Sequence, residues 1–333
     1  MRIETFAKAL AVLNAHPPRF EPQPARRDAF LRIGDFLEKS VRAGQPHDLK
    51  AKPARAASPL PSPVWQIVEQ RLAKALREIE DADLPTETLQ AWQMYNDGVI
   101  IRAGDVVLGL DVIPMPRFFG WPEPAGLTEK VAGLLDLLLV THEHEDHYDR
   151  QLVGACLRLG KPVFLPEPLA RDWGTDPNLF RAGHGGEVEL DDLHILARRG
   201  VHVWRESADD VPVVYYEVAC QKGFRFLFGG DADYTKGMEK TAGADLDLFF
   251  LPWRNPSELY EDGHPARIGT TLDAVNIAIE RLAPRALLYE HCAELNHVYD
   301  GFTPSFDIAL DLQRRLPVPS ELLFWGETVR LSK

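Results

Sequence analysis

Cysteine is scarce in this chain. Only Cys156, Cys220 and Cys292 occur among 333 residues, and no two of them form a Cys-x-x-Cys pair. An odd number of widely spaced cysteines argues against a disulfide framework and against a cysteine-based zinc site. We therefore expect a reducing, cytoplasmic setting.

Long apolar runs are missing as well. The N-terminal region has one short apolar run, residues 9–13, with Glu4 and Lys8 close to it. That run is too short for the core of a signal peptide. No stretch approaches the roughly 18 apolar residues that a membrane-spanning helix needs. We expect neither a secretory leader nor a membrane span.

Positive charge is in deficit. The chain has 37 Lys and Arg against 50 Asp and Glu, which gives a formal net charge of −13, and it has no long basic run. A chain this acidic repels the phosphates of nucleic acids. We therefore expect no nucleic-acid partner.

Residues 1–88 differ in their hydrophobic pattern and composition from the remainder of the chain. Residues 26–41, which include Leu31, and residues 62–79 place apolar side chains at helical spacing. Residues 43–63 are rich in Pro, Ala and Ser, which is typical of an extended linker. This pattern predicts an N-terminal helical appendage over 1–88. It packs on the main domain or forms a homo-oligomer, and the sequence leaves both options open.

Residues 89–333 contain short apolar runs separated by turns, which predicts strands mixed with helices and an α/β layered fold. Residues 211–220 and 224–231 read as two paired strands, and residues 321–331 as a closing, hairpin-like strand. Further strands are predicted at 98–112 (two strands around a glycine turn), 133–140, 161–166, 246–252 and 285–291, with a helix at 270–282.

The most informative stretch is Thr-His-Glu-His-Glu-Asp-His-Tyr-Asp, residues 141–149, directly after an apolar run. In a tight turn after a strand, His142 and His144 can share one metal ion while Asp146 and His147 bind a second. Imidazole and carboxylate ligands suit Zn²⁺, Mn²⁺ or Fe²⁺. Each ion needs more ligands than this turn supplies, so further ligands must follow at later strand ends.

Three later residues meet this requirement. His202 follows a strand-like segment, Asp231 follows an apolar strand and two glycines, and His291 ends another apolar strand. His194 and His184 compete with His202. His194 lies within a strand-like alternation and His184 in a glycine-rich loop before the expected strands, so we favour His202.

These motifs resemble those of the metallo-β-lactamase fold superfamily of metallo-hydrolases, over residues 89–333. Asp111, the His142–His147 motif, His202, Asp231 and His291 occur in the order found in that family. The resemblance implies a four-layer αβ/βα sandwich, which here carries the N-terminal helical appendage.

The resemblance also implies a role for each residue. His142, His144 and His202 would hold one ion; Asp146, His147 and His291 would hold the other; Asp231 would bridge the two ions. Asp111 would orient ligands through hydrogen bonds. The implied cofactors are two divalent ions, Zn²⁺ or Mn²⁺ rather than iron.

The segment that ends at Asp149, together with the C-terminal Trp-Gly-Glu-Thr-Val-Arg-Leu, is most similar to the branch of L-ascorbate-6-phosphate lactonase and N-acyl-phosphatidylethanolamine phospholipase D. Asp149 is therefore expected to support the ligands. Arg205, Arg254 and His297 lie where substrate contacts occur in this fold, and an arginine there could bind a phosphate or a carboxylate.

The expected reaction is hydrolysis of a small ester-type substrate, a phosphodiester or a lactone, by a metal-bridging hydroxide, with Asp146 accepting a proton from the attacking water. The alternative is a metal-binding scaffold on the same fold without hydrolysis. An iron-dependent oxidoreductase on the same fold is disfavoured. The flavodiiron pattern has a glutamate at the position of His144 and carries a flavin domain, and this sequence shows neither feature.

Overall fold

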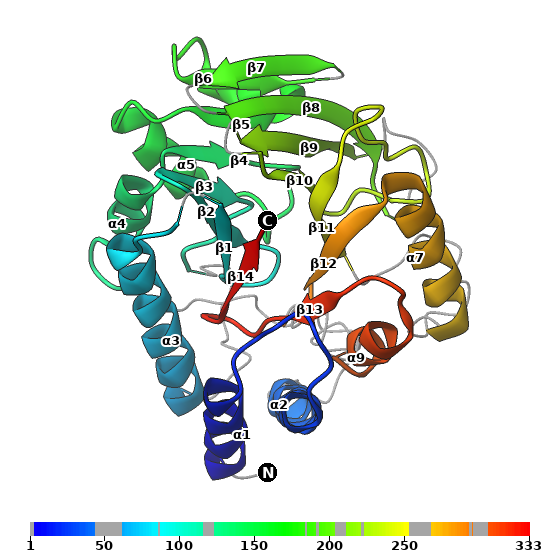
Figure 1. Ribbon diagram of the computed structural model, residues 1–333. Helices are drawn as coiled ribbons and strands as arrows, with labels where there is room; N and C mark the ends of the chain where they lie inside the picture. Colours follow the sequence, from blue (N-terminus) through cyan, green and yellow to red (C-terminus); the bar gives the residue numbers. More distant parts are fainter. Residues whose placement is uncertain are drawn as a thin grey trace, which may run out of the picture.

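Two seven-stranded β-sheets face each other in the computed structural model, and helices lie on their outer sides (Figure 1). The structure describes residues 3–43, 62–85, 87–115, 123–183, 185–190, 193–203, 211–220, 223–252, 268–292, 295 and 306–333. No helix among these residues is long and apolar enough to cross a membrane.

The first sheet joins the two ends of residues 89–333. Its edge strand comes from the C-terminus and pairs antiparallel with the first strand of the chain. The fourth to the seventh strands in spatial order run parallel to one another. In spatial order the sheet contains β14 (Thr328–Ser332), β1 (Thr88–Gln93), β2 (Val99–Ala103), β3 (Val106–Leu110), β4 (Leu137–Leu139), β5 (Val163–Pro166) and β6 (Leu179–Ala182).

The second sheet combines four parallel strands with an antiparallel extension. In spatial order it contains β13 (Ser320–Leu322), β12 (Pro284–Glu290), β11 (Leu246–Pro252), β10 (Arg225–Phe228), β9 (Pro212–Cys220), β8 (Leu193–Val201) and β7 (Gly186–Leu190). The predicted pairing of residues 211–220 with 224–231 is confirmed as the antiparallel pair β9–β10.

The C-terminal run 321–331 does not form the hairpin-like strand that its sequence suggested. β13 pairs parallel with β12, whereas β14 pairs antiparallel with β1, so the two halves belong to different sheets. Between them, Gly326 adopts φ 78°, and a Cβ atom there would lie 2.7 Å from the backbone oxygen of Arg71. Close packing against the N-terminal region therefore redirects the chain from one sheet to the other.

The strand predicted at residues 133–140 is shorter than expected. Residues 133–140 were expected to form one strand, but Gly133 and Leu134 end a helix, and the strand spans only Leu137–Leu139. An apolar run of this length fits a buried helix end as well as a strand, because both bury the same side chains.

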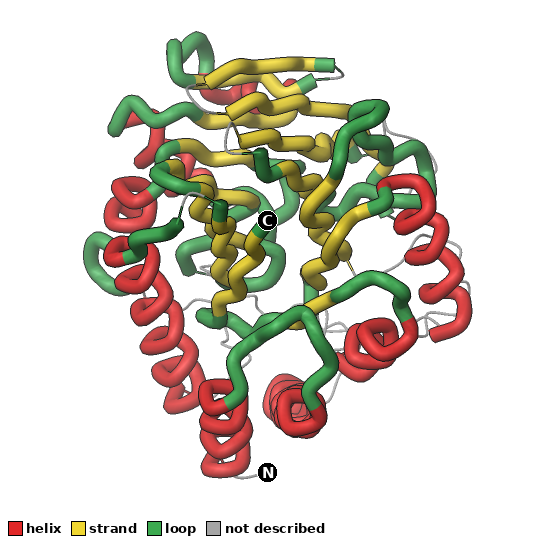
Figure 2. The backbone as a smooth tube through the Cα atoms, in the orientation of Figure 1, coloured by secondary structure: helices red, strands yellow, loops and turns green. Residues whose placement is uncertain are grey.

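Two layers of apolar side chains hold the molecule together. One layer lies between the sheets and includes Leu108, Leu139, Tyr216 and Phe250. The other layer lies between the sheets and the surrounding helices. Figure 2 shows these helices outside the strands. The helices are α1 (Ile3–Ala15), α2 (Pro24–Ala43), α3 (Ser62–Asp81), α4 (Leu127–Leu134), α5 (Arg150–Arg158), α6 (Glu167–Ala170), the short 3₁₀ helix Arg171–Trp173, α7 (Ile268–Leu282) and α9 (Phe306–Arg315).

The N-terminal helices pack into this second layer. Phe6 of α1 stacks on Phe36 of α2 with ring centroids 4.8 Å apart, and Phe30 lies 5.2 Å from Phe306 of α9. Leu31, which shares the predicted apolar stripe of α2, is instead exposed (37%). The helices over residues 3–81 thus share one hydrophobic core with the α/β region.

A buried ion pair also connects α2 to the segment between β13 and β14. The guanidinium of Arg26 donates two hydrogen bonds to Glu327, at 2.8 and 3.0 Å, and lies 3.7 Å from Glu321. All three side chains are buried. The same segment contacts the end of β1, because the Gly326 amide donates to the Gln93 carbonyl at 2.7 Å.

Candidate metal centre

The candidate ligands all follow strand ends at one edge of the sandwich. His142–His147 follow β4, His202 follows β8, Asp231 follows β10 and His291 follows β12. The carboxyl ends of neighbouring parallel strands meet at the same edge, which is why residues far apart in sequence meet here.

Gly230 permits the close contact between the two sheets at this edge. It adopts φ 48°, and a Cβ atom there would lie 2.4 Å from the side-chain oxygen of Thr141. Only glycine fits this conformation and this space without displacing the loop after β4. As a result, Asp231 lies beside His142.

The first half of the centre consists of three imidazoles and a carboxylate. Nε2 of His202 lies 3.4 Å and Nε2 of His142 lies 3.8 Å from Oδ2 of Asp231. The ring of His144 is 4.5 Å from that of His142 and 4.8 Å from that of His202. Ligand atoms of these four residues lie within 4.8 Å of one another, a spacing that suits one metal ion.

The second half lies on the other side of Asp231. Nε2 of His291 is 3.0 Å from Oδ1 of Asp231, and Nε2 of His147 is 3.7 Å from its Oδ2. Oδ2 of Asp146 lies 3.6 Å from Nε2 of His147. Asp231 therefore lies between the two groups of ligands.

Several buried histidine nitrogens at the centre lack hydrogen-bond partners within the described part of the chain, a pattern that suits a metal site. The Nε2 atoms of His142, His147 and His202 are buried, and none has a hydrogen-bond partner among the described residues. A buried polar atom without a partner costs free energy, unless a ligand supplies the missing interaction. These nitrogens converge on Asp231, so the residues fit a divalent ion on either side of it.

Asp111 contacts the loop after β4 through several hydrogen bonds. Its carboxylate accepts hydrogen bonds from the amide and the hydroxyl of Thr141, at 2.7 and 2.5 Å. Nδ1 of His147 lies 2.7 Å from Oδ2 of Asp111. An acceptor on the outer nitrogen orients the ring and directs Nε2 toward the centre.

Asp149 lies at the point where the loop after β4 meets the next helix. It is the N-cap of α5, and its Oδ1 accepts hydrogen bonds from the amides of Gln151 and Leu152 at 2.8 and 3.0 Å. A capped helix start fixes where the chain leaves the metal-binding loop.

Two residues at the centre were missed by the sequence analysis. Asn96 and Asp97 lie in the turn between β1 and β2, and both are buried. The Asn96 amide donates to Oδ2 of Asp146 at 2.8 Å, and Asp97 lies 3.2 Å from His147 and 3.3 Å from His291. Tyr-Asn-Asp-Gly between two apolar strands is a turn signal, and only the position of that turn at the ligand-bearing edge distinguishes it from an ordinary hairpin.

The ligands differ in their protonation. Burial and the charge of His147 lower the pKa of His142, which leaves its imidazole neutral. Burial opposes ionisation of Asp231, but His291 and His202 outweigh burial and hold the pKa of Asp231 well below its ordinary value.

His147 differs from His142: burial opposes its protonation, but Asp146 and Asp111 outweigh burial and raise the pKa of His147 well above its ordinary value. Metal ions bind neutral imidazoles and ionised carboxylates, so metal binding at His147 would release a proton.

Carboxylates behind the ligands have raised pKa values. Burial raises the pKa of Asp111 to about 6, so this residue is still ionised at neutral pH. Burial, together with the charges of Asp97 and Asp111, raises the pKa of Glu290 well above its ordinary value. Burial and these neighbouring carboxylates thus oppose ionisation of Glu290.

Two further polar residues, His194 and Asp233, make contacts outside the candidate centre. His194, the competitor of His202, lies on β8 and contacts Glu187 on the surface rather than the centre. Asp233 caps a turn, because its Oδ1 accepts hydrogen bonds from the amide and the hydroxyl of Thr235. Arg205, Arg254, His297 and His184 lie outside the described residues.

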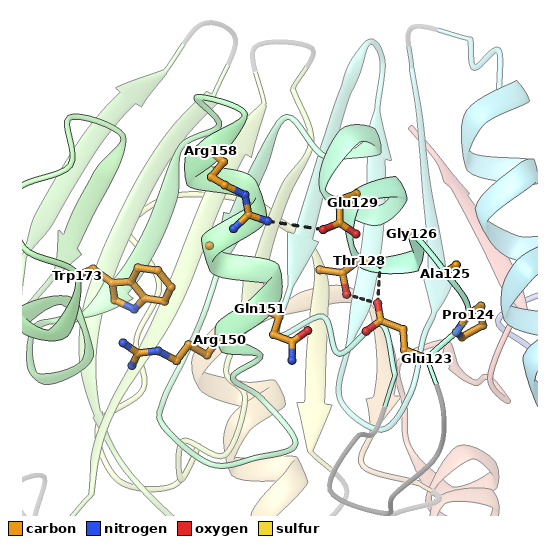
Figure 3. A pocket seen from close by; sticks show the side chains of 11 residues that line it. Glu123, Pro124, Ala125, Gly126, Thr128, Glu129, Arg150, Gln151, Arg158 and Trp173 are labelled. Carbon is orange, nitrogen blue, oxygen red and sulfur yellow. Dashed lines mark hydrogen bonds and ion pairs between the residues drawn. The ribbon is translucent and has the colours of Figure 1, made fainter.

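A separate cavity of about 600 Å³ lies between α4 and α5 (Figure 3). Arg150 stacks over Trp173 at 4.9 Å from the ring centroid, and Arg158 pairs with Glu129 at 3.6 Å. None of the candidate metal ligands lines this cavity. It is therefore distinct from the metal centre.

Comparison with known proteins gives matches in sequence and in structure. No family model matches the chain. A UPF0173 metal-dependent hydrolase of Nitratidesulfovibrio vulgaris is 31% identical over 158 residues, which is 43% of this chain and 61% of the relative. The chain thus spans less than two thirds of the length of the curated relatives that it matches.

Solved structures match over most of the chain. A metallo hydrolase of the archaeon Ignicoccus hospitalis aligns with a TM-score of 0.51 and 16% identity, over 74% of this chain and 99% of that protein. The metallo-β-lactamase fold protein YhfI of Bacillus subtilis aligns with a TM-score of 0.46 and 11% identity, over 74% and 100%. The chain therefore shares the two-sheet fold of the Ignicoccus hospitalis protein, and its candidate metal-binding residues lie together at one edge of the sheets.

Proposed function

We propose that this protein is a dinuclear metal-dependent hydrolase. His142, His144 and His202 would hold one ion, Asp146, His147 and His291 the other, and Asp231 would contact both. The observation that carries the proposal is the convergence of buried imidazole nitrogens without hydrogen-bond partners on one carboxylate. The names of the sequence relatives, metal-dependent hydrolases, support the same activity.

The ions, which we propose are Zn²⁺ or Mn²⁺, would supply a hydroxide nucleophile at neutral pH and positive charge for the oxygen of the substrate. Asp146 would accept a proton from the attacking water. Its carboxylate lies beside His147 and is held by the Asn96 amide, so its orientation is set before the substrate arrives. Thr141 and Asp111 would keep the histidine rings aligned.

The proposed substrate is a small ester-type molecule, either a phosphodiester or a lactone. Two divalent ions offset the carboxylates of the centre, so the net charge of −13 does not disfavour an anionic substrate. This chemistry needs no serine or cysteine nucleophile. The described cysteines are buried and form no disulfide, which supports the proposed reducing, cytoplasmic setting.

The experiment is to load the purified protein with Zn²⁺ or Mn²⁺ and to measure bound metal per chain. The loaded protein is then assayed on a bis-aryl phosphodiester and on a set of lactones, with Asp146→Ala as the control. Two ions and a turnover that Asp146→Ala abolishes are expected. Two ions without turnover on any of these substrates would favour a metal-binding scaffold, and fewer than one ion would overturn the proposal.

A homo-oligomer through the N-terminal helices is a separate proposal. Ile3 and Leu31 are large apolar side chains that α1 and α2 leave partly exposed, at 36% and 37%. Light scattering of the wild type and of Leu31→Glu tests it, because a charged side chain in such an interface lowers the measured mass to that of the monomer.

A further inference from the structure

Asp97 is the buried carboxylate of the centre that the family motifs leave without a role. Its side chain is fully buried, and neither of its oxygens has a hydrogen-bond partner among the described residues. An ionised carboxylate in the interior is costly unless a cation or several donors compensate it. The surroundings of Asp97 therefore have to supply positive charge.

One neighbour of Asp97 is the outer nitrogen of His147. Oδ2 of Asp97 lies 3.2 Å from Nδ1 of His147, but Oδ2 of Asp111 lies only 2.7 Å from the same atom. The single hydrogen on Nδ1 points to one acceptor, and Asp111 is the closer one. His147 alone does not satisfy Asp97.

The other neighbour of Asp97 is the inner nitrogen of His291. Oδ1 of Asp97 lies 3.3 Å from Nε2 of His291, and Oδ1 of Asp231 lies 3.0 Å from that same nitrogen. Ligand atoms of Asp97, His147 and His291 lie within 4.8 Å of one another, a spacing that suits one metal ion. A cation between them turns all three atoms into ligands.

The turn holds Asp97 rigidly in this position. Nε2 of Gln93 donates to the Asn96 carbonyl at 2.7 Å, and the Gly98 amide donates to the Tyr95 carbonyl at 3.0 Å. A Cβ atom on Gly98 would lie 3.0 Å from the Asp111 carbonyl, so glycine allows the turn to lie directly on the end of β3. Asp97 is therefore placed by the backbone and not by a flexible loop.

We propose that Asp97 is an eighth metal-binding side chain and a carboxylate ligand of the second ion. The inference rests on the dinuclear centre of the proposed function. It makes the two halves chemically different: the first has three imidazoles, whereas the second has three carboxylates, Asp97, Asp146 and Asp231, and two imidazoles. Oxygen-rich sites suit Mn²⁺ better than imidazole-rich sites do, so the second half selects Mn²⁺ more strongly than the first.

The test is calorimetric titration of the metal-free full-length protein with Mn²⁺ and, separately, with Zn²⁺. The variants are Asp97→Asn, Asp97→Ala and the matched control Asp233→Asn, which alters a buried carboxylate that caps a turn. A ligand role predicts that Asn and Ala both weaken binding of the second Mn²⁺ about 100-fold, because an amide is a poor ligand. Binding of the first ion should stay within about twofold of wild type, which shows that the fold is kept.

Two outcomes would overturn the inference. If Asp97→Asn binds the second ion like wild type and Asp97→Ala does not, then Asp97 is only a hydrogen-bond acceptor for His147. Wild-type affinity for the second ion in both variants would exclude any role of Asp97 in metal binding. If the wild-type protein binds fewer than two ions, the proposed dinuclear centre is itself wrong. This result distinguishes failure of the proposed function from failure of the inference about Asp97.

Discussion

The side-chain amide of Asn96 donates a hydrogen bond of 2.8 Å to Oδ2 of Asp146. The two residues are 50 positions apart and come from different strand ends. Asn96 adopts φ 54°, a conformation that asparagine tolerates better than most residues. The turn after β1 thereby orients the proposed catalytic carboxylate.

Replacement of Asn96 should lower turnover without unfolding the protein. Asn96→Gly keeps the left-handed backbone accessible but removes the amide, so we expect kcat/KM on the responsive ester substrate to fall about 10- to 100-fold. The free energy of unfolding should change by no more than about 1 kcal/mol. Unchanged kcat/KM in Asn96→Gly would show that Asp146 does not depend on this hydrogen bond.

Asp231 should be required for both ions. Its oxygens lie 3.0 to 3.8 Å from Nε2 atoms of four histidines, so Asp231→Ala removes a shared ligand. We expect bound Zn²⁺ to fall below one ion per chain in elemental analysis after dialysis. Asp233→Ala, two residues away, should keep the wild-type stoichiometry. Two tightly bound ions in Asp231→Ala would contradict a bridging role.

The buried ion pair between α2 and the C-terminal segment should contribute strongly to stability. Arg26→Met leaves Glu327 and Glu321 buried without their cation, which costs about 3–5 kcal/mol in the free energy of unfolding. The matched control is Arg27→Met, whose partner Asp311 lies at the partly exposed surface, and this change should cost less than about 1 kcal/mol. Urea unfolding measures both, and equal losses would argue against a special role for Arg26.

Asp247 should make stability depend on acid pH. Burial raises its pKa, but hydrogen bonds from the Lys333 side chain, the Arg225 amide and the Arg285 side chain outweigh burial and hold the pKa below its ordinary value of 3.8. A depressed carboxyl pKa stabilises the folded state above the unfolded-state value, and this contribution is lost as pH falls through the folded-state value.

The corresponding variant is Asp247→Asn. It should lower the free energy of unfolding by about 1–3 kcal/mol at pH 7, since charged hydrogen-bond partners are lost. The difference from wild type should shrink as the pH falls below 3.8, the ordinary value. Asp245→Asn, at an exposed position, is the control and should show little effect at either pH. A difference that stays constant with pH would contradict the assignment.

Much of the candidate centre could be predicted from the sequence because its proposed ligands follow local rules. His142 to His147 lie within six residues, and the remaining ligands each follow an apolar strand or strand-like segment. Alternation and turn residues locate strands, and the ends of parallel strands meet at one edge. These features depend only on neighbours in the chain, so a single sequence carries them.

Asn96, Asp97 and Arg26 could not be assigned in this way. Their roles depend on contacts with Asp146, His291 and Glu327, which lie 50, 194 and 301 positions away. In sequence, the first two look like turn residues and the third like a surface arginine. Only the folded chain determines which of them becomes buried.

The sequence by itself determined the class of fold, the metal-binding motif and the order of the ligands, because hydrophobic period and ligand type are local properties. Only the tertiary structure decided that residues 321–331 divide between two sheets, that the N-terminal helices share the core, and that the turn after β1 reaches the centre. The physical reason is that backbone hydrogen bonds between strands are nearly the same for every residue type, so strand pairing is selected by packing across the whole molecule.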